Sequence, residues 1–222
     1  MPRTLVFDVN ETLLDMGVLA PHFVRIYGSA DAQSRWFLEL QRLWLVATAT
    51  DHYEDFPTLI GHALRSVADG REVADADVEA FLDDVVRLPA HPDVPPALDR
   101  LRDAGVRLAA LTNGTLDAAR TQLDHAGIAD RFDAVMSADQ VQRYKPAPEP
   151  YRFAAQTLGQ ELGDLTMVAA HAWDIAGAHR AGMRTAFIAR PGKTLVPGWP
   201  APDLQDPDLG AVADALLGSA DV

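Results

Sequence analysis

Four groups of polar residues in the sequence have types that suit covalent chemistry on a small anion. Asp8 follows a short apolar run, and Thr112-Asn113-Gly114 follows a second one. Lys145 precedes a proline at the start of a helical segment, and His171 and Asp174 lie three residues apart where an apolar run gives way to a helical pattern. A carboxylate can act as a nucleophile, an ammonium beside it keeps it ionised, and hydroxyl, amide and glycine donors bind anions. Singly, each group is also typical of a helix cap, a turn, a surface charge or a structural histidine.

Alternating elements along the chain would bring these groups together. Short apolar runs predict strands at 5–7, 106–111, 134–136, 166–170 and 185–189. Segments with helical spacing lie at 95–104, 115–126, 149–159 and 174–181. This alternation predicts an α/β fold, a Rossmann-like doubly wound parallel sheet with helices on both faces. Because ligands bind beyond the carboxyl ends of such strands, the four polar groups are expected to share one edge of the sheet.

The first crossover of this sheet is a large helical insert. Helices are expected at 17–27, 54–68 and 75–87, and another carries the apolar stripe of 36–47 with Asp31 as its N-cap. A segment of this length is not a loop, so it predicts a helical cap domain over 15–91, inserted after the first strand. The core domain then comprises 1–14 and 92–222, with hinges near 14–17 and 88–92. No chemistry is assigned to the Pro- and Gly-rich tail after Arg190, which ends in a short helix at about 209–217.

Composition excludes several classes of function. The 222 residues include no cysteine, which excludes disulfide scaffolds, Cys-ligated metal sites and a thiol nucleophile. With 19 Lys and Arg against 32 Asp and Glu, the formal charge is −13, which argues against binding to nucleic acid or to anionic membranes. No apolar stretch approaches the roughly 20 residues of a membrane span, and the N-terminus does not fit a signal peptide. A cytoplasmic protein is therefore expected.

In order and spacing, the four groups resemble the motifs of the haloacid dehalogenase (HAD) superfamily, over essentially the entire chain. Within it the sequence is most similar to the type II L-2-haloacid dehalogenases. Phe7, Asp8, Thr12, Leu13 and Asp15 match the opening FD-x-x-x-T-L-x-D. Thr112-Asn113-Gly114, the separation of Lys145 from Tyr151, and the segment Ala172 to Ala178 match the later motifs.

The resemblance implies a metal-independent hydrolase without a cofactor, which cleaves the carbon–halogen bond of a short 2-haloacid through an aspartyl ester. The partner is then a small-molecule carboxylate. Asp8 would be the nucleophile, Lys145 would keep it ionised, Asp174 would hold Lys145 or the hydrolytic water, and His171 would be a general base or a donor to halide or substrate. The residues expected to bind substrate are Asn10, Thr12, Trp36, Thr112, Asn113 and Tyr151.

Two alternatives stay open. Most members of the superfamily are magnesium-dependent phosphatases, but they use a second aspartate as general acid and base where this chain has Asn10. The position of their acidic magnesium ligand looks like Ala169 here. The other alternative is a non-catalytic member that binds a small acid.

The match to the dehalogenases is incomplete. Their cap arginine, which receives the halide, aligns with Trp36, and Arg35 beside it points about 100° away on the helix. Trp36 and Tyr53 are expected to face the site. Glu11 replaces a usual glycine and is interpreted as a solvated loop acid. A homodimer is allowed by the resemblance and by the length of the apolar helix at 36–47.

Overall fold

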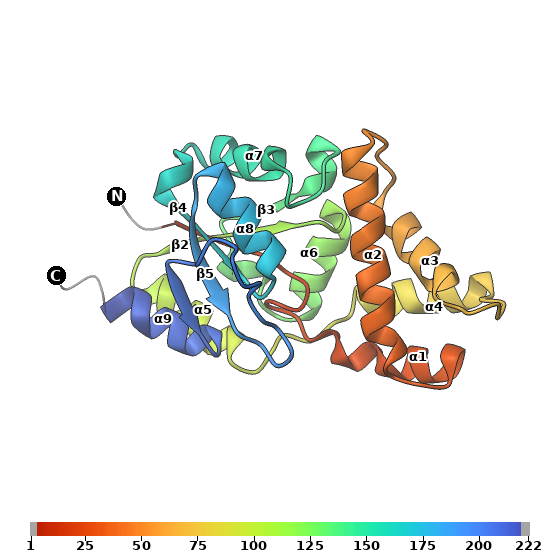
Figure 1. The fold of residues 1–222 in the computed structure, drawn as a ribbon. Helices are drawn as coiled ribbons and strands as arrows, with labels where there is room; N and C mark the ends of the chain where they lie inside the picture. Colours follow the sequence, from red (N-terminus) through yellow and green to blue (C-terminus); the bar gives the residue numbers. More distant parts are fainter. Residues whose placement is uncertain (1–3, 219–222) are drawn as a thin grey trace.

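Six parallel strands form a single sheet in the computed structural model, which describes residues 4–218 (Figure 1). The strands are β1 (Thr4–Phe7), β2 (Arg107–Thr112), β3 (Ala134–Ser137), β4 (Leu165–Ala169), β5 (Arg184–Ile188) and β6 (Leu204–Asp206). Their order across the sheet is β3-β2-β1-β4-β5-β6, with β1 in the interior. The predicted α/β fold with a parallel sheet is confirmed, and the five expected strands lie within one residue of their predicted bounds.

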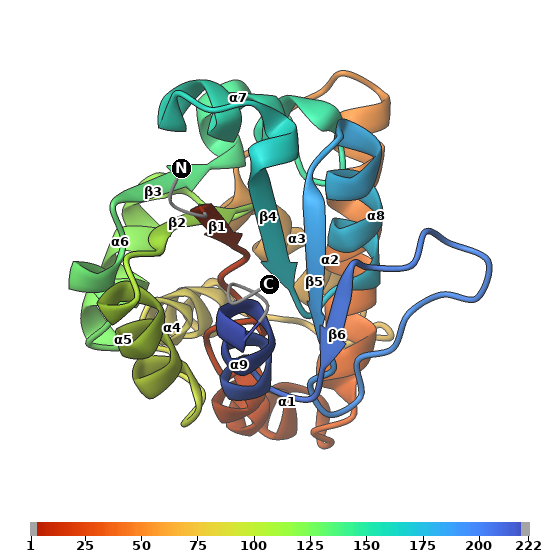
Figure 2. The same cartoon turned by 90° about the vertical axis from the view of Figure 1, so that its left-hand side faces the viewer.

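Helices cover both faces of the sheet (Figure 2). They are α5 (Val94–Asp103), α6 (Leu116–His125), α7 (Pro148–Leu158), α8 (Ala172–Ala181) and α9 (Leu209–Gly218). Successive side chains of a strand point to opposite faces, and β1 shows this clearly. Leu5 and Phe7 pack into the apolar cluster that includes α5 and α9, while Val6 packs into the cluster under α7 and α8. The sheet is thus doubly wound, and β1 is buried on both sides.

The sixth strand was not predicted. β6 is three residues long, lies at the edge of the sheet and pairs only with β5. Its sequence, Leu-Gln-Asp, is partly exposed and carries no apolar run. Such a strand depends on its neighbour for pairing, and the local sequence does not indicate it.

Four helices, α1 (Ala20–Tyr27), α2 (Ala32–Ala49), α3 (Phe56–Ser66) and α4 (Asp75–Val85), lie together beyond one end of the sheet (Figure 1). Trp36 of α2 packs against Phe23 and Phe81 with ring centroids 5.4 and 4.9 Å away, so aromatic contacts form the centre of this helical group. Asp31 precedes α2 as expected, but its side chain makes no capping hydrogen bond. Over residues 4–218, no helix is long and apolar enough to cross a membrane.

The chain passes between the sheet and the cap helices twice, and the two passages run side by side. Leu14 forms a β-bridge with Ala90, the Asp15 amide donates to the Pro89 carbonyl at 2.8 Å, and the His91 amide donates to Leu13 at 2.9 Å. A 3₁₀ turn over Met16–Leu19 then leads into the cap. Both passages lie where hinges were expected, and the division into 1–14 with 92–222 and 15–91 stays a prediction. Three further 3₁₀ turns occur in the core, at Ala129–Arg131, Ala138–Val141 and Leu162–Asp164.

Candidate active site

Strand register gathers the four polar groups at one edge of the sheet. Phe7 pairs with Ala110 of β2 on one side and with Val168 of β4 on the other. Asp8 is the next residue, so it emerges between the carboxyl ends of β2 and β4. Thr112 ends β2, and His171 follows β4 by two residues. The expectation that these groups share one edge is confirmed.

Lys145 lies between two carboxylates in the interior. Its Nζ donates to Asp8 Oδ1 at 2.9 Å, to Asp174 Oδ2 at 2.6 Å and to the Leu111 carbonyl at 2.8 Å. Its side chain is 0% exposed. Burial alone would lower the pKa of Lys145, but the charges of Asp174 and Asp8 raise it above its ordinary value. The ammonium therefore keeps its charge, and all three of its protons have acceptors.

The two carboxylates differ in charge environment. Burial alone would raise the pKa of Asp8, but Lys145 and then His171 hold it far below its ordinary value. The pKa of Asp174 is raised by burial and by the charge of Asp8, against the attraction of Lys145. Asp8 is thus the more firmly ionised carboxylate of the pair.

Tyr151 contacts this cluster through Asp174, on the side away from the cavity. Its hydroxyl donates to Asp174 Oδ1 at 2.6 Å, and its ring is buried under the sheet. It does not line the cavity above Asp8. The expectation that Tyr151 contacts substrate is therefore wrong, because its hydroxyl is already directed to Asp174.

The neutral residues of the site divide into two kinds. Thr12 donates its hydroxyl to Asp8 Oδ2 at 2.7 Å and accepts the Ala170 amide at 2.9 Å, as a donor to the nucleophile should. Asn113 accepts the Lys145 amide at 2.8 Å and donates to the Lys145 carbonyl at 3.1 Å, so it positions the lysine. Thr112 Oγ1 accepts the Gly114 amide at 3.1 Å, and Asn10 Oδ1 accepts from Gln122 at 3.0 Å. Asn10, Thr112 and Asn113 also line the cavity, whereas Thr12 lies beneath it.

His171 is held between two carboxylates. Its Nδ1 lies 3.1 Å from Asp8 Oδ2 and its Nε2 lies 2.8 Å from Glu11 Oε2. An ionised carboxylate only accepts hydrogen bonds, so each ring nitrogen must carry a proton. Although burial disfavours the charge, these hydrogen bonds raise the pKa of His171 above 6.5. The geometry opposes a general base, and both N–H groups of His171 are directed to Asp8 and Glu11 and not to a substrate or halide, which was the other expectation.

Glu11 is not the solvated acid expected from the sequence. It accepts from His171 and, at 2.5 Å, from Lys193 Nζ, and these two partners hold its pKa below the ordinary value against the effect of burial. Its φ of 61° lies in the left-handed region, which explains why glycine is usual at this position. Lys193 comes from the tail to which no chemistry was assigned. A glutamate in place of the usual glycine at position 11 is the one feature of the sequence that hinted at the contact between Glu11 and Lys193.

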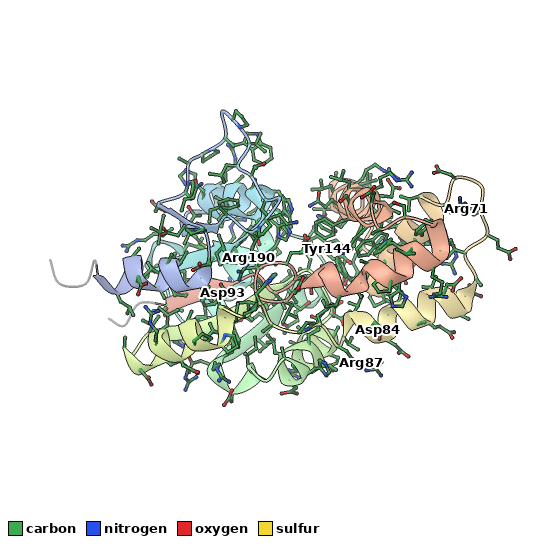
Figure 3. The ribbon with its side chains drawn as sticks, turned by 90° about the horizontal axis from the view of Figure 1, so that it is seen from below. Arg71, Asp84, Arg87, Asp93, Tyr144 and Arg190 are labelled. Carbon is green, nitrogen blue, oxygen red and sulfur yellow. The ribbon has the colours of Figure 1, made fainter. Side chains whose placement is uncertain are left out.

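The contacts of Arg190 were not predicted from the sequence either. Its Nε and Nη2 donate to the Thr12 carbonyl at 3.2 and 2.9 Å, and its Nη1 pairs with Asp93 at 2.7 Å. Figure 3 shows Arg190 and Asp93 side by side at the inner end of the core, with Tyr144 toward the cap. Tyr144 donates its hydroxyl to the Glu54 carbonyl at 2.5 Å. Core side chains thus brace both the loop after β1 and the cap.

A small cavity of about 30 Å³ lies above Asp8, between the sheet edge and the cap. Its lining residues are Asp8, Asn10, Met16, Trp36, Phe37, Leu40, Trp44, Phe56, Ile60, Val85, Thr112, Asn113, His171 and Trp173. This volume holds about one water molecule, which is too small for an organic substrate in the conformation described. A larger hollow of about 820 Å³ shares Met16, Trp36 and Phe37 with it, and these side chains separate the two spaces.

The two expectations for cap residues have different outcomes. Trp36 faces the site as expected. Tyr53 does not line the cavity. Its hydroxyl instead donates to Asp139 Oδ1, with a distance of 2.5 Å between the two oxygens. Arg35 is exposed and pairs with Asp69, so it does not replace a cap arginine.

Hydrogen-bond donors surround the Asp8 carboxylate. Over residues 4–218, no three His, Asp or Glu side chains converge in a way that could hold a metal. The Asp8 oxygens instead accept from Lys145, Thr12 and His171. The indole N–H groups of Trp36, Trp44 and Trp173, all from cavity-lining residues, are buried and have no acceptor.

Comparison with known proteins agrees with this geometry. The family profile of the haloacid dehalogenase-like hydrolases matches residues 2–182. The (S)-2-haloacid dehalogenase of Pseudomonas sp. (strain YL) is 32% identical over 184 residues, which are 82% of this chain and 79% of that protein. The (S)-2-haloacid dehalogenase of Xanthobacter autotrophicus is 32% identical over 86% of this chain and 76% of its own length.

Solved structures extend the similarity to the three-dimensional fold. The L-2-haloacid dehalogenase from Xanthobacter autotrophicus with chloropropionic acid covalently bound superposes with a TM-score of 0.91 at 25% identity. The match covers 98% of this chain and 99% of that one. From its motifs, its fold and these matches, the chain belongs to the haloacid dehalogenase-like hydrolase family.

Proposed function

We propose that this protein hydrolyses the carbon–halogen bond of a short 2-haloacid through an ester on Asp8, without a metal ion. The observation that carries the proposal is the buried cluster in which Lys145 joins Asp8 and Asp174. A carboxylate held ionised beside a cavity can attack an sp³ carbon in line and expel halide. Relatives named as 2-haloacid dehalogenases, one of them with chloropropionic acid covalently bound, support this choice.

The leaving group separates this activity from phosphatase activity. A halide departs without a proton, whereas the alkoxide of a phosphate ester needs a general acid. The residue two positions after Asp8 is Asn10, whose amide cannot supply a proton and whose oxygen accepts from Gln122. The position that supplies the general acid in the phosphatases therefore carries no acid here, whereas the departure of a halide needs none.

The cavity wall offers donors for an anionic substrate. Asn10, Thr112 and Asn113 present polar groups on the side of the sheet, and the unpartnered indole N–H groups lie in the aromatic wall. Buried donors without acceptors are costly, which favours an anion as their natural occupant once the cap has moved. We therefore include these tryptophans among the groups that hold the carboxylate or the leaving halide.

Measured turnover on matched substrates tests the proposal. We expect halide release from 2-chloropropionate or chloroacetate, no phosphate release from small phosphate esters, and no loss of activity with EDTA. Asp8→Asn should abolish halide release. Activity that a chelator removes and Mg²⁺ restores would support the phosphatase alternative, and small-acid binding without turnover in either form would support the non-catalytic one. The homodimer and the cytoplasmic location remain predictions of the sequence.

A further inference from the structure

We propose that Asp8 attacks through Oδ1, and that His171, as an imidazolium positioned by Glu11, stabilises the negative charge that forms on Oδ2 when the ester is hydrolysed. This inference rests on the proposed function. It assigns His171 a catalytic role that is opposite in proton demand to that of a general base. It also gives Glu11 and Lys193, which the hydrolytic scheme above does not use, a positioning role.

The two oxygens of Asp8 are not equivalent. Oδ2 accepts two hydrogen bonds, from Thr12 at 2.7 Å and from His171 at 3.1 Å, whereas Oδ1 accepts one, from Lys145 at 2.9 Å. Each carboxylate oxygen has about two lone pairs in the plane of the group. Both lone pairs of Oδ2 are engaged, and one on Oδ1 remains for a bond to carbon. Oδ1 is therefore the attacking oxygen, and Oδ2 becomes the carbonyl oxygen of the ester.

The donors on Oδ2 are those that ester hydrolysis needs. In the first step the bond from Oδ1 to the substrate carbon forms, the carbon–halogen bond breaks, and halide leaves with its electron pair. In the second, water attacks Cγ of Asp8 and the negative charge moves to Oδ2, which faces a hydroxyl and a cationic N–H. The bond between Cγ and Oδ1 then breaks, and Oδ1 leaves as the hydroxyl oxygen of the product. One proton of the water ends on that hydroxyl, and the other is released when Asp8 ionises again.

The groups in direct contact with His171 favour its charged form, against the effect of burial. Its charged neighbours are Asp8 and Glu11, and beyond them lie Lys145 with Asp174, and Lys193. His91 lies on the far side of Glu11, with its Nε2 3.3 Å from the Glu11 carbonyl oxygen. Phe37 of α2 and Trp173 of α8 stack on the imidazole at 5.6 and 5.0 Å, and aromatic faces attract cations.

The geometry of the donors is fixed from outside the site. The Ala170 amide donates to Thr12 Oγ1, so the hydroxyl proton of Thr12 is directed to Oδ2. Glu11 holds Nε2 of His171, which turns Nδ1 toward Oδ2. Lys193 in turn holds Glu11 and lies 5.1 Å from the ring centre of Phe37. Preorganised donors of this kind need no rearrangement when the charge develops.

Rapid-quench mass spectrometry of the Asp8 peptide tests the proposal, since it follows ester formation and ester hydrolysis separately as a function of pH. We expect wild-type ester hydrolysis to slow as pH rises through the pKa of His171, and Glu11→Gln to move this limb to lower pH. His171→Gln should remove the limb and slow hydrolysis by about 10²- to 10³-fold, so that the ester accumulates. His22→Gln is the matched control, because His22 pairs with Asp84, does not line the cavity and should leave both steps unchanged.

Hydrolysis that speeds up with rising pH through the same limb, or a limb that Glu11→Gln leaves in place, would overturn the proposal. Nitrogen-15 NMR of the wild-type imidazole keeps the test independent of variant folding, and a neutral ring for His171 near pH 7 would also overturn it. A wild-type protein that forms no ester with any 2-haloacid would refute the proposed function instead, while NMR would still report the charge of His171.

Discussion

Replacing Lys145 by methionine is the most informative perturbation of the buried cluster. The side chains have similar length, so the change removes a charge and three hydrogen bonds while leaving most of the volume filled. It leaves Asp8 and Asp174 facing each other without a cation between them, and it also leaves the Leu111 carbonyl without its donor.

The expected magnitude follows from the burial of all three groups. Removing one partner of a buried ion pair costs about 3–5 kcal/mol, because the remaining charge is uncompensated. For a chain of this size, that loss corresponds to a fall in Tm of about 6–20 °C, at roughly 2–4 °C per kcal/mol. We also expect ester formation to fall by about 10²-fold, equivalent to about 2.7 kcal/mol in the barrier, because Lys145 no longer keeps Asp8 ionised and in place.

A second substitution tests the electrostatic cause. In Lys145→Met with Asp174→Asn, one of the two carboxylates that lost the ammonium is removed, so the double variant should be more stable than Lys145→Met by about 0.5–3 kcal/mol. The control is Lys193→Met, since Lys193 is partly exposed and contacts one carboxylate, and it should cost about 1 kcal/mol or less. Chemical denaturation measures all three. A Lys145→Met variant as stable as wild type, or a double variant less stable than the single one, would refute the reasoning.

Three further predictions concern packing, pH and the cavity wall. In Gly177→Ala the added Cβ would lie 2.6 Å from Pro146 Cβ and from Tyr151 Oη, so we expect stability to fall by about 1–3 kcal/mol and kcat to fall as well. Gly163→Ala is the control and should be neutral, because its added Cβ has its nearest contact at 3.9 Å. Equal effects of the two substitutions on denaturation and turnover would contradict this prediction. Because the pKa of His171 is raised in the folded state, its contribution to the free energy of unfolding is complete below pH 6.5 and is lost as the pH rises through the pKa of the folded protein. Denaturation curves of His171→Gln should lack this loss of stability. Identical pH dependence of wild type and variant would count against the ion pairs of His171. Trp36→Phe keeps an aromatic ring and removes an N–H that has no acceptor, so stability should change little while kcat/KM for a 2-haloacid falls about 10- to 100-fold. An unchanged kcat/KM would exclude the Trp36 N–H as a substrate donor. Trp199→Phe, on the surface, is the control.

Sequence alone predicted the parts of the fold and site that depend on local pattern. Apolar runs identify five of the strands, and chain order then places Asp8, Thr112 and His171 at one edge of the sheet. The ion pair of Lys145 followed from the family resemblance. Each of these inferences uses residues within one motif, or the general rule that parallel strands end together.

The contacts that sequence missed join segments far apart in the chain. Glu11 and Lys193 are separated by 182 positions, and Arg190 and Thr12 by 178. Nothing local distinguishes such side chains from solvated surface charges. Tyr151 was misassigned for a related reason, since its distance from Lys145 in sequence does not reveal that Asp174 captures its hydroxyl. His171 could be assigned as a donor only once both of its carboxylate partners were known.

The central claim is that Asp8 forms an ester and that water attacks this ester at the aspartyl carbon. Mass spectrometry of a peptide containing Asp8, after a single turnover of a 2-haloacid in ¹⁸O water, tests it most directly. We predict one ¹⁸O atom in the Asp8 carboxylate and none in the hydroxyacid product of that turnover. Label in the hydroxyacid with none in Asp8 would show that water attacks the substrate directly, and it would contradict the account.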